Sequence, residues 1–132
     1  MSEANKSIYL RTFNEQLFAF VDDLEIVFPD NDTVSTMKSG LIALKKVNPK
    51  IIISTWQTSI VAPYSTKIDE GDFDFFIEKD YTDDLGDYKN SESILSSINE
   101  MRSSVRQLEE SNKQKSLEYI KNLCKLSQIY HS

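Results

Sequence analysis

The sequence predicts an all-α protein in one domain, with a compact cluster of short helices over residues 1–90 and one long C-terminal helix over residues 91–132. Two observations carry this prediction. Only three glycines and three prolines occur in 132 residues, and most of them lie where a helix is expected to begin or end. Between them, apolar residues recur every three or four positions, which is the spacing of one helix face. A chain of this length can bury roughly two-thirds of its unfolded surface, so one core suffices without disulfide bonds.

The first two helices are predicted over residues 11–27 and 33–47. The apolar stripe of the first consists of Phe13, Leu17, Phe20, Val21, Leu24 and Phe28. The stripe of the second consists of Val34, Met37, Leu41 and Leu44, with Val47 as an optional last member. Pro29 ends the first helix because its ring cannot continue the hydrogen-bond ladder, and the turn at residues 30–32 supplies a capping side chain.

A third helix is predicted from Pro49 to about Val61. Asn48 can cap it, and Pro49 suits the first helical position. Its apolar residues at helical spacing are Ile52, Ile53, Trp56 and Ile60. The β-branched run at residues 51–53 is also compatible with a strand. The cap, the proline and the spacing all agree with a helix, which is therefore preferred.

Residues 63–90 are predicted to be irregular, with short helical pieces. After Pro63 we expect a helical turn that stops at Gly71, and then a short helix capped by Asp72. The apolar residues of this short helix are Phe73, Phe76 and Ile77. The stretch 79–90 is expected to be a loop.

Residues 91–130 contain neither glycine nor proline, which favours one continuous helix of roughly 60 Å at about 1.5 Å per residue. Its predicted seam comprises Ile94, Ile98, Met101, Val105, Leu108, Asn112, Lys115, Tyr119, Leu123, Leu126 and Tyr130. Two consecutive steps of four after Lys115 form a stutter, and Asn112 is a polar seam residue of the kind that specifies register or partner number. A helical hairpin that breaks near residues 111–115 is the alternative.

Negative charge is concentrated in residues 69–90, which we call the acidic segment and which is also rich in aromatic residues. Residues 69–87 hold nine acids and one base, a net charge of −8 within a chain of −6. No basic face is evident elsewhere, so direct binding of nucleic acid is not expected. The same charge can steer a basic protein partner toward the segment. Phe75 either packs under the long helix or anchors such a partner.

No constellation of residues indicates catalysis, a cofactor or a metal, and the chain is not expected to be an enzyme. His131 is the only histidine and is penultimate, which is a poor place for a rigid proton relay. Zinc needs several Cys or His ligands, and Cys124 is the only cysteine. No register fits an EF-hand loop, since a start at Asp80 places Leu85 where glycine is required. An irregular cation site, or a small enzyme that uses carboxylates, is the remaining alternative.

The same sequence predicts a soluble, cytoplasmic protein. A single cysteine allows no internal disulfide, and the N-terminal residues lack the apolar stretch of a signal peptide. No apolar run approaches the about 20 residues that a membrane span needs.

Three stretches together resemble a known group of proteins. They are Phe28–Asn31, Asn48–Lys50 with Trp56, and Gly71–Phe73 followed by Phe76–Tyr81. This ensemble resembles small helical proteins encoded by large nucleocytoplasmic DNA viruses of algae and amoebae, over about residues 12–130. The resemblance implies a virus-encoded protein that is made in the host cytoplasm and has a structural or virion-associated role, such as a minor capsid component. It implies no active site.

The hypothesis that follows is a non-enzymatic structural or protein-interaction protein. It would bind other copies of itself or a larger viral assembly, without a cofactor. The alternative is an acidic regulatory module that engages a basic protein partner. The residues predicted to bind a partner are Phe75, Asp80, Tyr81, Asp83, Asp84, Asn112 and Tyr130.

Overall fold

A computed structural model of the chain describes residues 3–72, 74–78 and 89–132 and shows helices, with no strand among these residues. The prediction of an all-α protein is therefore confirmed. The elements are α1 (Glu3–Val27), α2 (Asp32–Val47), α3 (Ile51–Trp56), the π-helical turn η1 (Gln57–Val61), α4 (Ser65–Asp69), α5 (Phe75–Glu78), α6 (Lys89–Arg106) and α7 (Glu110–Tyr130). The predictions for Phe73 and for residues 79–88, which include Asp80, Tyr81, Asp83 and Asp84, lie outside the described residues.

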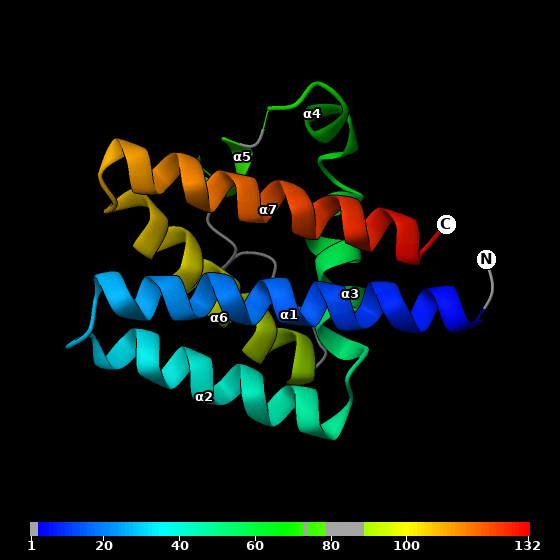
Figure 1. Cartoon of the computed structure of the whole chain (residues 1–132), viewed down its shortest axis with the longest axis horizontal. Helices are drawn as coiled ribbons and strands as arrows, with labels where there is room; N and C mark the ends of the chain where they lie inside the picture. The colour runs from blue at the N-terminus through cyan, green and yellow to red at the C-terminus, as the bar shows by residue number, and fades with distance from the viewer. Residues whose placement is uncertain (1–2, 73, 79–88) are drawn as a thin grey trace.

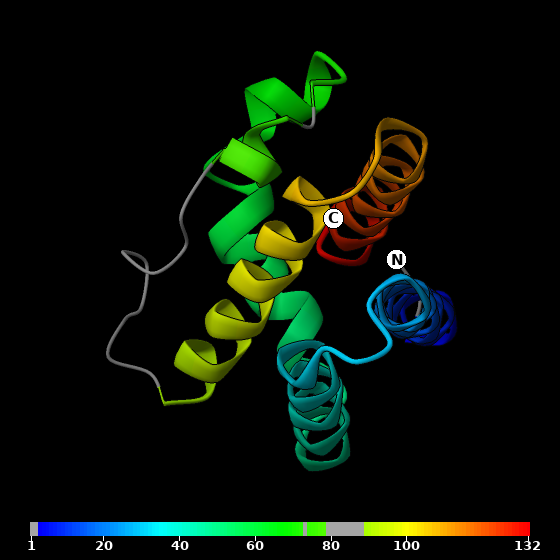
Figure 2. The same cartoon turned by 90° about the vertical axis from the view of Figure 1, so that its left-hand side faces the viewer.

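The arrangement places α1 between two neighbours. Helix α7 lies beside α1 and runs in the opposite direction, so that both ends of the chain lie at the same end of the molecule, and α2 lies on the other side of α1 (Figure 1). In Figure 2, α1, α2 and α7 point toward the viewer whereas α6 crosses them at an angle. Helix α6 packs mainly on α2, α3 and α5, and α7 packs mainly on α1 and η1.

Helices α1 and α2 follow the predicted boundaries at Pro29, but α1 begins at Glu3 rather than at Arg11. Its extra turns lie against the end of α7, where the Lys6 Nζ atom is 5.7 Å from the centroid of the Tyr130 ring. Asn31 caps α2, since its Oδ1 atom accepts hydrogen bonds from two backbone N–H groups of the first turn. Val47 is 79% exposed, so the apolar stripe of α2 stops before it.

The third predicted helix is confirmed as a helix rather than a strand, but it contains a π-helical turn. In η1 the Ala62 N–H donates to the Gln57 carbonyl at 2.9 Å, which is the wider π-type bond. The turn gives the helix one extra residue, so that Ile60 and Val61 are both buried. Its Gln57 side chain accepts a hydrogen bond from the Ser127 hydroxyl at 2.9 Å, which ties α7 to η1.

Gly71 stops α4 as predicted. Its φ of +76° is the left-handed conformation that glycine adopts most readily. The Asp72 N–H donates to the Lys67 carbonyl and the Gly71 N–H to the Ile68 carbonyl, which is the Schellman pattern of helix ends. The Asp72 carboxylate then accepts from the Asp74 N–H at 3.1 Å, just before α5 begins.

The prediction of one continuous C-terminal helix is wrong. The chain bends at residues 107–109, and the hairpin alternative is correct in kind, although the bend precedes residues 111–115. The N–H groups of Gln107 and Leu108 bond to carbonyls three residues back, which tightens the end of α6. Glu109 is extended, with φ −64° and ψ 158°, a conformation open to every residue. No glycine or proline is therefore needed for the bend.

The bend also changes which face of α7 is buried. The predicted seam residues Ile94, Ile98, Met101 and Val105 of α6 are all buried, and so is Leu108 in the bend that follows. In α7 the buried residues are Ser116, Ile120, Leu123, Cys124 and Ser127. Leu123 belongs to the predicted seam, and the seam residues Tyr119, Leu126 and Tyr130 are partly buried against the core, whereas Asn112 and Lys115 are exposed. The predicted seam therefore lies at the edge of the buried face of α7 rather than at its centre, because the prediction assumed that α7 continues the helical rotation of α6.

The core is built around Trp56, whose side chain is fully buried. The Phe13 ring of α1 meets it edge-on at 6.0 Å between centroids, and the Phe76 ring of α5 stacks on it at 5.8 Å. Cys124 of α7 is buried beside the indole. The Trp56 Nε1 atom has no hydrogen-bond partner at full bonding geometry within the described residues, although the indole interacts with the Cys124 thiol.

Replacement of Gly40 by Ala is expected to stabilise the protein by about 0.5–1 kcal/mol. Gly40 lies inside α2, and a Cβ atom there would meet nothing within 4 Å, so the change removes backbone freedom of the unfolded chain without a clash. Gly71→Ala is the matched control and should destabilise by about 1 kcal/mol, because its φ is positive. Urea unfolding of the three proteins measures both effects, and equal shifts for the two variants would contradict the assignment.

Stability is expected to fall as the pH rises above 9. Burial raises the pKa of the Cys124 thiol from 9.0 to about 12, with a small opposing effect of Trp56. Below pH 9 the thiol is protonated in both states. Above pH 9 the thiol ionises in the unfolded chain but stays protonated in the folded one. The free energy of unfolding therefore falls as the pH rises from 9 to 12. Thermal unfolding from pH 8 to 11 should show the decline, and Cys124→Ala should make it shallower. An identical slope in the variant would argue against the buried thiol.

A cleft between α1 and α7 as the candidate functional site

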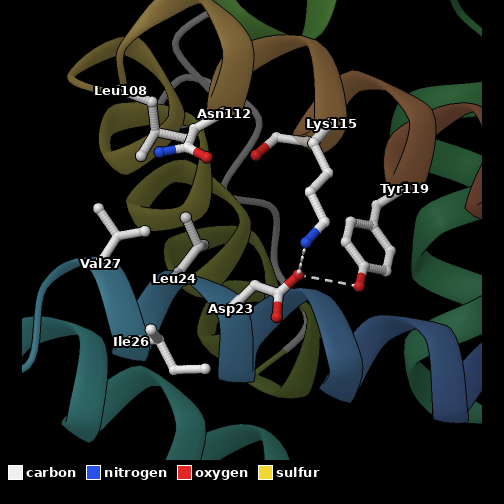
Figure 3. A pocket seen from close by; sticks show the side chains of 9 residues that line it. Asp23, Leu24, Ile26, Val27, Leu108, Asn112, Lys115 and Tyr119 are labelled. Carbon is white, nitrogen blue, oxygen red and sulfur yellow. Dashed lines mark hydrogen bonds and ion pairs between the residues drawn. The ribbon is translucent and has the colours of Figure 1, made fainter.

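The last turns of α1 and the first turns of α7 enclose a cleft of about 230 Å³ next to the bend at residues 107–109 (Figure 3). We call it the α1–α7 cleft. Its lining residues are Asp23, Leu24, Ile26, Val27, Leu108, Asn112, Lys115, Ser116 and Tyr119. The cleft exists because the bend lays α7 along α1, which brings residues of the predicted first helix next to residues of the predicted seam.

A carboxylate forms the polar side of the cleft. The Tyr119 hydroxyl donates to Asp23 Oδ2 at 2.9 Å, and the Lys115 Nζ atom lies 3.3 Å from the same oxygen (Figure 3). Tyr119 is held in place by Phe20, whose ring stacks on it at 5.4 Å. Burial, and then the bond to Asp23, raise the pKa of Tyr119, so its hydroxyl stays protonated and continues to donate.

Apolar side chains form the other side. Leu24 and Leu108 are buried, whereas Ile26 is 75% exposed and Val27 is also exposed. In Figure 3, Leu24, Val27 and Leu108 converge on the end of the cleft away from Tyr119. Single exposed apolar residues are ordinary, but here two of them, Ile26 and Val27, lie together at the edge of a concave surface.

One of the predicted partner-binding residues, Asn112, lines this cleft. Asn112 lies in the first turn of α7 and is exposed. An exposed amide supplies both a donor and an acceptor to a docked backbone.

The other described residues of the predicted set lie elsewhere. Phe75 is 5% exposed and stacks on Tyr64 with 4.6 Å between centroids, so it packs in the core, as one of its two alternatives predicted. Tyr130 is half-buried at the far end of α7, between Lys6 and His131. The structure therefore does not bring Phe75, Asn112 and Tyr130 together into one site.

The sequence interpretation missed the α1 side of the cleft. Ile26 and Val27 do not belong to the apolar stripe of the first predicted helix. Apolar residues outside such a stripe are expected to face outward, and this was the signal in the sequence that could have identified them. The pairing of Asp23 with Tyr119 had no such signal, because 96 positions separate the two residues.

The described part of the chain offers neither a metal site nor a membrane-spanning helix. No group of three or more His, Cys, Asp or Glu side chains in it is arranged to hold a metal ion. None of its helices is both long enough and apolar enough to cross a membrane.

The hydrogen bond between Tyr119 and Asp23 is expected to stabilise the fold more than the ion pair between Lys115 and Asp23. Tyr119→Phe should cost about 1 kcal/mol, because it removes the hydroxyl that donates to a half-buried carboxylate. Lys115→Ala should change stability by less than about 0.5 kcal/mol, because the lysine is mostly exposed. A double-mutant cycle of Tyr119→Phe with Asp23→Ala, measured by urea unfolding, should give a coupling free energy above about 0.5 kcal/mol. Strict additivity would mean that the bond does not form in solution.

Comparison of the chain with protein families, with curated proteins and with solved structures finds no match to any of them. The candidate site is therefore interpreted from its own residues and their chemistry.

Proposed function

We propose that the chain is a non-enzymatic protein-interaction domain and that the α1–α7 cleft is where a protein partner docks. The observation behind the proposal is that Ile26, which is 75% exposed near the end of α1, lines the cleft. Covering a side chain of this kind with a partner contributes roughly 1.5–3 kcal/mol. Exposed apolar residues beside a concave surface favour protein docking over solvent exposure.

The chemistry of the cleft defines what would bind. An apolar side chain of the partner would enter beside Val27 and Leu108 and cover Ile26. The amide of Asn112 would bond to the backbone of the docked segment, and the Asp23–Lys115 pair would orient its polar groups. In this view the contact is an apolar centre with a polar rim.

The resemblance described above supplies a context for this role. Within it, the domain is a virion-associated protein or a minor capsid component, made in host cytoplasm, and the partner is another copy of the chain or a component of the same assembly. A cleft near the bend of a helical hairpin suits this role, because the same surface recurs on every copy.

A second candidate function is an acidic regulatory module. Asp69, Glu70 and Asp74 are exposed around α4 and α5, while Asp72 is partly neutralised by Lys67 at 3.5 Å. These acids favour a basic protein partner, and binding to them should weaken strongly as salt is added. Docking in the α1–α7 cleft should respond much less to salt, because its centre is apolar.

Self-association is expected to depend on the rim of the cleft. Light scattering should show a mass above 15.2 kDa that grows with concentration, and Ile26→Asp should return the protein to the monomer. Ile8→Asp is the matched control, because Ile8 is an exposed isoleucine at the other end of α1. A native chain that stays monomeric up to millimolar concentration, or a loss of mass in both variants, would contradict docking of a second copy at this cleft.

A further inference from the structure

A second groove lies on the opposite flank of α1, between α1 and α2. It encloses about 410 Å³ and is lined by Phe18, Asp22, Lys38, Ile42, Lys45 and Lys46. Its floor is apolar, since Phe18 is half-buried and Ile42 is 37% exposed. On α2, Lys38 lies four residues before Ile42, and Lys45 and Lys46 lie three and four residues after it, so all four residues share one face of that helix.

The cations of this groove are not equivalent. Lys38 Nζ lies 2.8 Å from Asp22 Oδ1 and 3.2 Å from Glu25 Oε1, so its charge is already balanced by α1. The Lys45 Nζ atom lies over the Phe18 ring, 5.3 Å from its centroid. This cation–π contact holds the ammonium group at the edge of the groove. Lys46 is exposed beside it.

The result is a local reversal of charge. The whole chain carries −6, yet the exposed rim formed by Lys45 and Lys46 has no ion-pair partner among the described residues. Two lysines in the last turn of α2 also offset the negative end of that helix. This stabilisation of the helix end does not explain why the apolar floor beside the two lysines, formed by Phe18 and Ile42, is open to solvent.

We propose that this groove binds an acidic amphipathic helix of a protein partner. A leucine-sized side chain of that helix would sit over Phe18 and Ile42, and carboxylates one turn away would pair with Lys45 and Lys46. Shape and charge agree, because a trough between two helices accepts the apolar face of a third and the open cations select acids beside it. This surface is separate from the α1–α7 cleft, so either proposal can fail without the other.

The test uses a designed probe: a fluorescent 16-residue helix with leucines at every third or fourth position and glutamates flanking them. Anisotropy titration with the full chain should show binding that weakens on raising NaCl, and a probe with lysine in place of glutamate should bind at least tenfold more weakly. Lys45→Glu with Lys46→Glu should weaken binding of the acidic probe at least tenfold. Lys121→Glu with Lys125→Glu, an equal change of charge on α7, should leave it unchanged, and circular dichroism should show that both double variants remain folded.

Three results would overturn the proposal. One is equal affinity for the acidic and the lysine-substituted probes. Another is undiminished binding by a folded variant with Lys45 and Lys46 reversed. The third is binding of vesicles that contain anionic phospholipid, lost in the same variant, when the peptide probe does not bind; the groove would then be a lipid-binding face. Ile42→Ser is a second check. It leaves the charges unchanged and should weaken binding of the acidic probe, because it removes an apolar residue from the floor of the groove.

Discussion

The packing around Trp56 is the constraint on which the rest of the structure depends. Its indole contacts Phe13 of α1 and Phe76 of α5 and lies against Cys124 of α7. Three elements that are distant in the sequence therefore meet on one rigid ring system, and such aromatic contacts prefer defined geometries. Helices α1 and α7 are both held at this point and lie side by side over the turns that follow (Figure 1), and the α1–α7 cleft opens between them.

Helix α1 connects the two candidate surfaces because neighbouring residues on it face different helices. Asp22 points to Lys38 of α2, and Asp23 points to Lys115 and Tyr119 of α7. Successive side chains of a helix are rotated by about 100° from one another, so two adjacent acids can serve two grooves. The acids on α1 thus fix α2 and α7 on either flank, and each flank keeps exposed apolar groups beside a lysine.

Local chemistry explains why most helix boundaries could be predicted. Asn31, Pro29 and Gly71 act through their own backbone and through neighbours within a few residues, and each acts where expected. Burial of the α6 seam was also predictable, because one face of a regular helix repeats without reference to the rest of the chain. The α1–α7 cleft could be predicted from the sequence only in part. Asn112 was predicted as a partner-binding residue, whereas Asp23, Ile26 and Tyr119 were not.

The sequence by itself determined an all-α chain, the residues of its central core and the start or end of most helices, because these depend on short-range periodicity and on capping. The tertiary structure alone decided the bend at residues 107–109, the buried face of α7 and the two grooves that flank α1. Glu109 turns the chain with an ordinary extended backbone, so nothing local marks the bend. The bend is selected by burial that becomes possible only when α7 meets α1, a contact between residues that lie far apart in the chain.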